Sequence, residues 1–268
     1  MLVLIKGAGD LASGVALRLF RSHIPVVMTE IAAPTTVRCS VAFSGAVTNG
    51  TAVVEGVCAK LATGIAAIHT CLVQGVIPVV IDPDAAVRAA LQPDVLVDAI
   101  LAKKNLGTRL TDAPCVIALG PGFTAGIDCH AVIETKRGHT LGRVIYAGSA
   151  IANTGIPGEI AGHSADRIIR ACADGVFTPL CKIGTIVQKG DAVACVGKEM
   201  ILAQLDGVVR GMLPTGVVVT RGMKSGDIDP RGIVSSCETV SDKALAIGGG
   251  VLEALLHFTN ESNERILP

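Results

Sequence analysis

The chain has 268 residues, of which 50% are apolar and 17% are charged. That is enough to bury one large core or two smaller ones, which excludes a disordered chain. Lys and Arg together number 23, Asp and Glu together also number 23, and aromatic residues make up 2% of the chain. Nucleic acid is therefore not the expected partner, because its recognition needs excess positive charge or stacking aromatic rings.

Targeting and redox signals point to the cytoplasm. The first residues run directly into an apolar strand pattern without a secretion signal, and no apolar run reaches the roughly 18 to 20 residues of a membrane span. The nine cysteines include no Cys-x-x-Cys pair. We expect reduced cysteines, no contact with a membrane and no metal site.

The chain begins with the pattern of a right-handed βαβ crossover. Residues 2–6 and 25–29 are short β-branched runs typical of buried strands. Residues 10–21 between them carry apolar side chains mostly at helical spacing. Two parallel strands joined by a helix are therefore expected.

A glycine motif lies between the first strand and the first helix. Gly7-Ala-Gly9-Asp10-Leu-Ala12 has the form G-x-G-x-x-A, with Glu30 about 20 residues further on. Gly7 would make the tight turn, Gly9 would let amides approach a pyrophosphate, Ala12 would allow close packing, and Glu30 would bind ribose hydroxyls. Asp10 weighs against bound phosphate because its carboxylate would repel it. Both a nucleotide site and a Rossmann-like turn without a cofactor stay open.

The α/β alternation continues after an irregular excursion. Between residues 34 and 56 the glycine-rich pattern predicts an insertion with a hairpin at Asn49-Gly50. A helix is expected over 58–74 and a short one over 85–90. Strands are expected over 77–81, 95–98 and 116–119, and further β-like stretches over 131–135 and 143–146.

The segment from Gly120 to Arg143 holds the densest group of candidate functional residues. It follows a predicted parallel strand and begins with a second glycine loop at Gly120-Pro-Gly122, where ligands tend to bind in open α/β sheets. Strand alternation would put His130 and Glu134 on one face, as general acid/base chemistry requires. The alternative is a polar hairpin with exposed ion pairs and no catalytic role. The candidate catalytic residues are Asp128, His130, Glu134 and His139, and the candidate ligand-binding residues here are Gly120, Gly122 and Arg143.

After Gly175 the pattern becomes short Val and Ile stretches bounded by glycine. Residues 184–190 and 216–222 align position by position, which indicates two similar β halves. Residues 177–232 resemble the biotinyl/lipoyl-like barrel-sandwich hybrid, but Lys198 lacks the motifs of a modified lysine. Asp227 and Asp229 are interpreted as turn residues rather than cation ligands.

These patterns together predict an α/β fold with two domains. A Rossmann-like, mostly parallel sheet domain is expected over residues 1–172. A small all-β barrel-sandwich-hybrid (biotinyl/lipoyl-like) domain is expected over 173–235, and a C-terminal helix and tail over 236–268. Gly248-Gly-Gly250 in that helix would let it pack closely on another element.

With those residues in view, the chain resembles the YqeB-type accessory proteins of the selenium-dependent molybdenum hydroxylase system. The segments that carry the resemblance are Ile5–Gly14, Val116–Arg143, Asn153–Gly158 and Asp227–Arg231. The resemblance implies a role in maturing or supplying the molybdenum cofactor, or its labile selenium, for such a hydroxylase. It implies no settled reaction.

Three functional classes follow. The preferred one is a maturation factor that binds a phosphorylated pterin cofactor or a nucleotide. The second is an NAD(P)-dependent oxidoreductase, and the third is a non-catalytic chaperone that docks the hydroxylase. The expected partners are accordingly a molybdenum hydroxylase and a small phosphorylated ligand, with the molybdenum cofactor and NAD(P) as the candidate cofactors.

Overall fold

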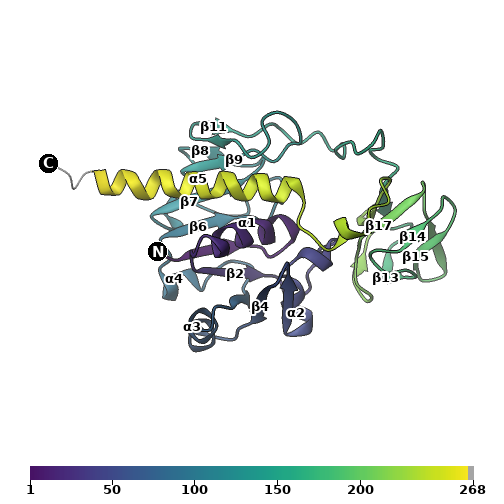
Figure 1. Cartoon of the computed structure of the whole chain (residues 1–268), viewed down its shortest axis with the longest axis horizontal. Helices are drawn as coiled ribbons and strands as arrows, with labels where there is room; N and C mark the ends of the chain where they lie inside the picture. Colours follow the sequence, from purple (N-terminus) through teal and green to yellow (C-terminus); the bar gives the residue numbers. More distant parts are fainter. Residues whose placement is uncertain (265–268) are drawn as a thin grey trace.

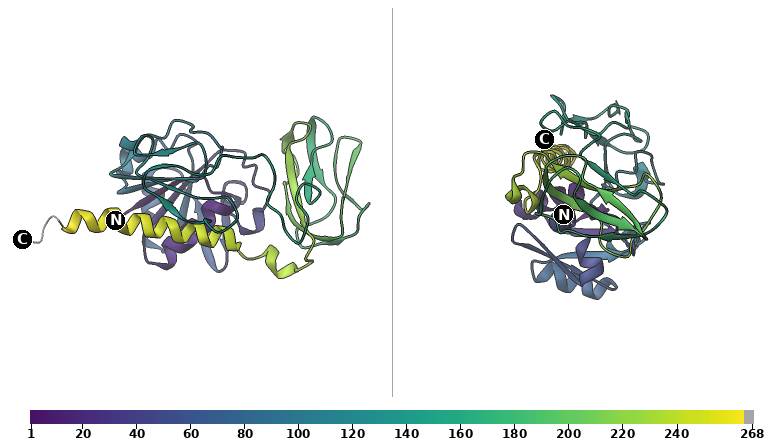
Figure 2. Two further views of the ribbon diagram at one scale, coloured as in Figure 1. Left: turned by 90° about the horizontal axis from the view of Figure 1, so that it is seen from above. Right: turned by 90° about the vertical axis from the view of Figure 1, so that its right-hand side faces the viewer.

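The computed structural model describes residues 1–264 and contains two units, which we call the α/β unit and the β unit (Figure 1). The α/β unit comprises residues 1–150 and the last helix, and the β unit comprises residues 167–232. A connecting loop of residues 151–166 joins them. Its chain passes from one unit to the other along the side of the molecule (Figure 2).

One sheet and its helices form the α/β unit. The helices are α1 (Asp10–Arg21), α2 (Gly45–Asn49), α3 (Ile65–Val73), α4 (Arg88–Leu91) and α5 (Asp242–Glu264), with 3-10 turns at Cys39–Val41, Leu110–Asp112 and Val234–Cys237. The sheet strands are β1 (Val3–Lys6), β2 (Val26–Glu30), β3 (Thr51–Val54), β4 (Val57–Leu61), β5 (Ile77–Ile81), β6 (Val95–Asp98), β7 (Cys115–Leu119), β9 (Ala131–Ile133) and β10 (Val144–Ile145). A separate pair consists of β8 (Thr124–Ala125) and β11 (Gly148–Ser149).

The strand order in this sheet is β10-β9-β7-β6-β1-β2-β5-β4-β3. Neighbours from β9 to β4 are parallel, whereas β10 and β3 at the two edges are antiparallel to theirs. Alternation along the strands divides the core into two layers. Val3 and Ile5 face α1 and α5, while Leu4 faces the layer that contains α3. The carboxyl ends of β1, β6 and β7 meet at one edge of the sheet, toward the β unit.

The β unit has a core of its own, built around Phe177, Val193 and Val209. Its strands are β12 (Ile168–Arg170), β13 (Gly175–Pro179), β14 (Ile186–Val187), β15 (Ala192–Val196), β16 (Glu199–Leu202), β17 (Gly207–Met212), β18 (Val218–Val219) and β19 (Lys224–Asp229). They form two four-stranded antiparallel sheets, β12-β19-β17-β14 and β16-β15-β13-β18. The repeated segments supply the matching edge strands β14 and β18.

This architecture contradicts the expected fold. That fold combined a Rossmann-like, mostly parallel sheet with a biotinyl/lipoyl-like barrel-sandwich hybrid. The first sheet is mixed, because a β3–β4 hairpin and strand β10 add antiparallel edges. The second unit consists of two antiparallel sheets, and it includes β12, which lies before the expected boundary at residue 173. Glycine-bounded Val and Ile runs predict strands but do not determine which strands pair.

Two local predictions also differ from the structure. The expected hairpin at Asn49-Gly50 is wrong, because Gly50 (φ 78°) ends α2 in the left-handed conformation. The hairpin turn is at Glu55-Gly56, where both residues have positive φ values of 45° and 81°. Residues 58–61 of the expected 58–74 helix belong to β4, and the helix starts at Ile65.

Helix α5 covers the sheet next to α1, as the small residues at 248–250 predict (Figure 1). A Cβ added to Gly248 would lie 2.9 Å from the carbonyl oxygen of Gly14, so the two helices are too close for larger side chains there. The final residues of the expected C-terminal tail, 265–268, lie outside the described part of the chain.

Candidate functional site

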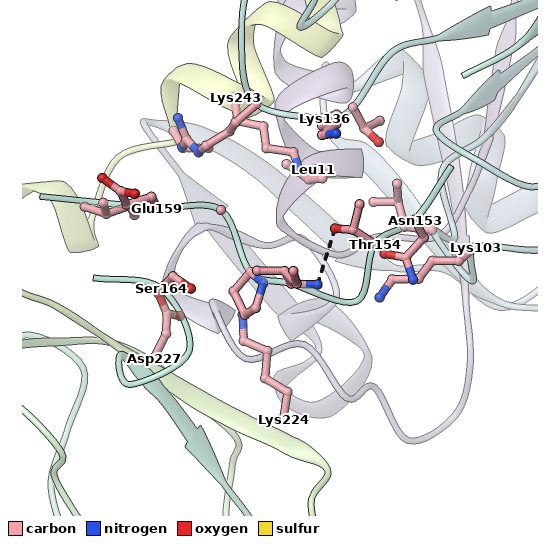
Figure 3. A pocket seen from close by; sticks show the side chains of 18 of the residues that line it. Leu11, Lys103, Lys136, Asn153, Thr154, Glu159, Ser164, Lys224, Asp227 and Lys243 are labelled. Carbon is pink, nitrogen blue, oxygen red and sulfur yellow. Dashed lines mark hydrogen bonds between the residues drawn. The ribbon is translucent and has the colours of Figure 1, made fainter. Parts of the chain in front are cut away.

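A pocket of about 830 Å³ lies between the two units at the carboxyl edge of the parallel strands. Its walls come from the first turn of α1, the segments after β7 and β9, the connecting loop, strands β17 and β19, and the start of α5 (Figure 3). Eight basic and three acidic residues line it. They are Arg38, Lys103, Lys136, Arg137, Arg167, Arg210, Lys224 and Lys243, and Asp10, Glu159 and Asp227. The excess of positive charge suits an anionic ligand.

Two arginines from different units meet at the base of the pocket. Arg38 comes from the excursion before α2, and Arg210 comes from β17, where its side chain interrupts an apolar strand. Both residues are 6% exposed. Burial and then the charge of Arg210 lower the pKa of Arg38 below its ordinary value. Two like charges held out of water are costly unless anions neutralise them.

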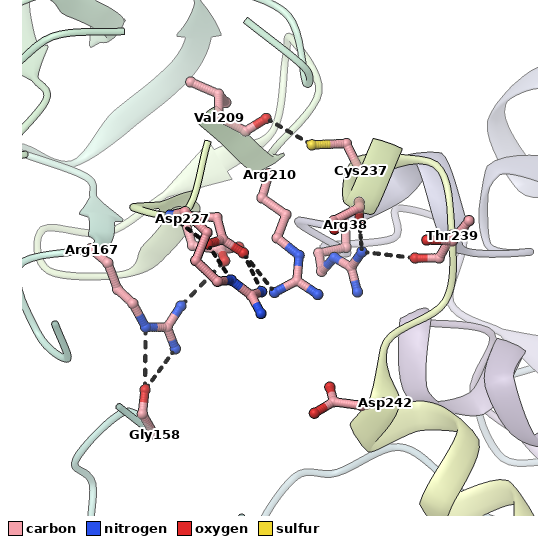
Figure 4. Close-up of polar contacts among 12 residues, drawn as sticks. Arg38, Gly158, Arg167, Val209, Arg210, Asp227, Cys237, Thr239 and Asp242 are labelled. Carbon is pink, nitrogen blue, oxygen red and sulfur yellow. Dashed lines mark hydrogen bonds and ion pairs between the residues drawn. The ribbon is translucent and has the colours of Figure 1, made fainter. Parts of the chain in front are cut away.

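The protein's own groups satisfy these arginines only in part. Arg38 donates to the carbonyl oxygens of Ser236 and Thr239, and its Nη1 lies 3.8 Å from a carboxylate oxygen of Asp10. Arg210 forms an ion pair with Asp229 at 3.4 Å, and Asp229 is shared with Arg231. The Nε atoms of both arginines are buried without a hydrogen-bond partner. Figure 4 shows the Arg38, Arg210 and Arg167 guanidinium groups directed toward the same space.

The carboxylates of β19 are already paired with arginines. Asp227 Oδ2 lies 3.3 Å from Arg167 Nη1, and Asp229 accepts bonds from Arg231 Nε and Nη2 at 2.9 and 2.6 Å. Arg167 also donates from Nε and Nη2 to the carbonyl oxygen of Gly158, at 3.2 Å each (Figure 4). Both aspartates therefore orient arginines, Arg167 holds the connecting loop, and Asp227 Oδ1 is buried without a hydrogen-bond partner. No cluster of metal-ligating side chains occurs among the side chains that the structure describes.

Lys243 enters the pocket from the first turn of α5. It is half-buried, and its side chain points toward Leu11 of α1 (Figure 3). Within the described residues, its amine has no hydrogen bond or ion pair. Burial, followed by the charge of Arg137, lowers the pKa of Lys243 below the ordinary range for lysine.

The first glycine turn has its expected backbone shape but is occupied by the protein's own carboxylate. Gly7 has φ 97°, and a Cβ there would lie 3.0 Å from the carbonyl oxygen of Ala99. Glu30 accepts hydrogen bonds from the amides of Ala8 and Ile31, at 2.9 and 2.8 Å. An amide that the motif would offer to phosphate is thus bound to Glu30. Gly9 precedes α1 without a side-chain cap, and Ala12 is buried in the core.

The second glycine loop serves close packing rather than an open cradle. A Cβ on Gly120 would lie 2.5 Å from the Thr135 hydroxyl oxygen, and one on Gly122 would lie 2.6 Å from the Lys104 backbone. Gly120 and Gly122 therefore let neighbouring segments approach. Pro121, between them, lines the pocket.

The structure does not bring His130 and Glu134 together as an acid/base pair. They lie at opposite ends of β9. His130 Nδ1 accepts a hydrogen bond of 2.9 Å from the Val116 amide, and burial lowers its pKa. The Glu134 carboxylate is buried and accepts bonds from the amides of Lys136 and Ile151, at 2.7 and 2.8 Å. Both side chains have structural partners and neither lines the pocket.

The remaining predicted residues also lie away from the pocket lining, with one exception. Asp128 accepts bonds from the Thr124 amide and the Asn105 side chain, so it caps a turn. His139 and Arg143 are exposed on the loop between β9 and β10. Asp10 is the exception, since it lines the pocket beside Arg38. The predicted segment contributes instead through Thr135–Gly138, and the loop around Asn153–Gly158 forms a wall.

Sequence reasoning missed the main cations of the site. Arg38, Arg167, Arg210 and Lys243 are far apart in the chain, and no short motif contains two of them. One signal was available, because Arg210 interrupts the apolar run Gly207–Met212 of a buried strand. A buried arginine in such a position indicates a charged partner or an anionic ligand.

The fold and pocket define a two-unit α/β protein with a cleft whose charged lining is mostly basic. The chain is 56% identical over 260 residues to the uncharacterized protein YqeB of Escherichia coli K12, an alignment that covers 97% of this chain and 48% of YqeB. The chain thus spans about half the length of that relative. The identity supports a place in the YqeB family for the region that the two proteins share. No protein-family model matches the chain.

Solved structures with some likeness are of the desuccinylase and aspartoacylase class. A succinylglutamate desuccinylase/aspartoacylase from Rhodobacter sphaeroides aligns at 24% identity and TM-score 0.23, covering 32% of this chain and 29% of that one. An aspartoacylase family protein from Mesorhizobium loti aligns at 11% identity and TM-score 0.28, covering 85% and 84%. None of the helices within residues 1–264 has the length and apolar character needed to cross a bilayer.

Proposed function

We propose that this protein binds a phosphorylated small molecule in the pocket between its two units, as an accessory factor that matures a selenium-dependent molybdenum hydroxylase. The proposal that the pocket binds phosphate rests on Arg38 and Arg210. Both arginines are buried, and the protein's own groups satisfy them only in part. Planar guanidinium groups bind phosphate oxygens through paired charge-assisted hydrogen bonds. The phosphorylated pterin of the molybdenum cofactor is the proposed ligand, on the strength of the sequence resemblance.

The pocket supports this ligand class better than it supports a dinucleotide on the first glycine turn. The Ala8 amide of that turn is bound to Glu30, and Gly7 and Gly9 do not line the pocket. The volume of about 830 Å³ is within the usual range of roughly 300 to 1,000 Å³ for small-molecule sites. A ligand bridging Arg38 and Arg210 would also contact both units.

Calorimetry with inorganic pyrophosphate as the probe tests the binding site. We expect measurable binding by the wild type, and Arg38→Lys or Arg210→Met should weaken it by about 10-fold to 100-fold, the effect of losing a charge-assisted hydrogen bond. Arg221→Met, at an exposed arginine outside the pocket, is the matched control and should bind like the wild type. Equal affinities for all four proteins, or no binding at all, would exclude the pocket as a phosphate site.

The maturation role needs a separate measurement. Hydroxylase activity would be assayed in cells that carry the wild type, Arg210→Met or Arg221→Met in place of the native gene. We expect active hydroxylase with the wild type and Arg221→Met, and inactive hydroxylase with Arg210→Met. Full activity with Arg210→Met would show that maturation does not use this pocket.

A further inference from the structure

Lys243 is the one pocket residue whose amine combines partial burial with the absence of any protein partner among the residues described. Two other cations near it are engaged, since Arg137 pairs with Asp242 and Arg38 lies beside Asp10, and Lys224 is exposed. Fold stability does not explain this position of the amine, because an amine at the surface or in an ion pair would cost less desolvation free energy. Its place in the fold, at the pocket wall opposite the β unit, makes it available to a bound ligand.

Charged neighbours from several elements set the chemistry of this amine. Asp242 precedes it on α5, but that carboxylate is held by Arg137 through bonds of 2.7 and 2.8 Å. Lys243 also lies within the first turn of α5, where the helix dipole disfavours a cation. The charged groups that act on it from other elements are Arg137, Asp10, Lys224 and Glu134.

Burial and the nearby Arg137 and Lys224 favour the uncharged amine, while Asp10 and Glu134 oppose this. The net direction is a pKa below that of an exposed lysine. An uncharged lysine amine is a nucleophile, and in enzymes it adds to carbonyl groups. Arg38 and Arg210, which line the same pocket, would hold the phosphate of the same molecule.

We propose that Lys243 is a reactive amine that forms an imine with a phosphorylated aldehyde or ketone bound in this pocket. The amine nitrogen adds to the carbonyl carbon, and the carbonyl oxygen then leaves as water. That water takes one proton from the amine and one from solvent, so the product is a protonated imine and no oxidant or reductant is needed. The inference rests on the proposed function in that the phosphate must bind at Arg38 and Arg210.

Pyridoxal 5′-phosphate, a phosphorylated aldehyde, is the probe, with borohydride to reduce and trap any imine. After brief treatment of the full chain, we expect mass spectrometry to find one adduct per chain, mapped to the peptide with Lys243. Lys243→Met and Lys243→Arg should lose it, and Lys198→Arg, at an exposed lysine outside the pocket, should keep it. Melting temperatures of all variants check that they fold.

The labelling pattern separates the two proposals. Pyridoxal without phosphate, or excess pyrophosphate, should reduce labelling at least 10-fold if the arginines position the phosphate. Adducts spread over many lysines, or placed on Lys103, Lys136 or Lys224 instead, would overturn the assignment to Lys243. If pyrophosphate binds by calorimetry but Lys243 is not labelled, the phosphate site stands and the reactive amine is wrong. If labelling at Lys243 is unaffected by pyrophosphate and by Arg210→Met, the arginines do not serve it.

Discussion

The Arg137 guanidinium makes two hydrogen bonds with the Asp242 carboxylate, Nη1 to Oδ2 at 2.7 Å and Nη2 to Oδ1 at 2.8 Å. This pair joins the segment after β9 to the first turn of α5, at the rim of the pocket. The hydrogen bonds from Arg137 hold the pKa of Asp242 well below its usual range. The same pair raises the pKa of Arg137, so both partners stay charged at neutral pH.

Asp242→Asn should lower the free energy of unfolding by about 0.5 to 1 kcal/mol at pH 7, a small effect because the pair is partly solvated. A carboxylate with a depressed folded-state pKa stabilises the fold fully above its unfolded pKa of about 3.9. That contribution is lost as the pH falls toward the folded-state pKa. Urea unfolding of wild type and variant at pH 7 and pH 3 measures the difference, which should shrink at pH 3. A difference that grows on acidification would contradict this account, and Glu253→Gln on the same helix is the control.

Glu134→Gln should destabilise the protein by roughly 1 to 3 kcal/mol, the cost of breaking buried hydrogen bonds. Each carboxylate oxygen accepts one backbone amide, and the Gln side chain has one acceptor oxygen and one donor nitrogen. The exposed Glu238→Gln should change stability by less than about 0.5 kcal/mol. Thermal and urea unfolding decide the matter. If Glu134→Gln is as stable as the wild type, the carboxylate is not the structural acceptor described here.

How far the sequence predicts the structure depends on how local each feature is. The first strand and helix follow from apolar spacing within β1 and α1 themselves. The hairpin was misplaced because Asn-Gly is typical both of hairpin turns and of the left-handed residue that ends a helix, and Gly50 serves the second purpose. Whether Asn-Gly makes a hairpin turn or ends a helix depends on the pairing of β3 with β4, and β4 lies further along the chain.

The site was harder to predict because it is assembled from distant parts of the chain. Asp10 was identified as a candidate, since glycine turns mark the carboxyl ends of strands, and it lines the pocket. Arg38 and Arg210 were not, because they come together only through the packing of the β unit against the α/β unit. His130 and Glu134 share a short β segment, but their backbone partners direct the side chains to different surroundings.

His130 gives a prediction about pH. Because burial lowers its folded-state pKa, the folded protein takes up a proton less readily than the unfolded chain, whose histidine has a pKa of about 6.5. Stability from this residue is therefore present above pH 6.5 and is lost as the pH falls through the folded-state pKa. His130→Asn keeps an acceptor near the Val116 amide but cannot titrate. The stability advantage of the wild type over this variant should decrease between pH 7.5 and pH 5, and an increase would reverse the assigned direction.

The contact between α1 and α5 gives a prediction in which two glycines respond oppositely to the same change. A Cβ on Gly14 would lie 2.6 Å from Ala244 Cβ and 3.0 Å from its backbone, whereas a Cβ on Gly249 meets nothing within 4 Å. Gly249→Ala should therefore stabilise the helix by up to about 1 kcal/mol. Gly14→Ala should instead destabilise the protein by about 1 kcal/mol or more, because overpacking outweighs the gain in helix propensity.

A double-mutant cycle tests whether the closeness of Gly14 and Ala244 causes that loss. Ala244→Gly removes the nearest methyl group, so Gly14→Ala should be less harmful in that background than in the wild type. Neighbouring residues typically couple by about 0.5 to 3 kcal/mol, and the sign here should favour the exchanged pair. Urea unfolding of the four proteins gives the coupling energy. Additive effects would mean that the helices move apart freely. In that case the tight α1–α5 contact would not fix the start of α5 at the pocket, and it would not fix Lys243 there either.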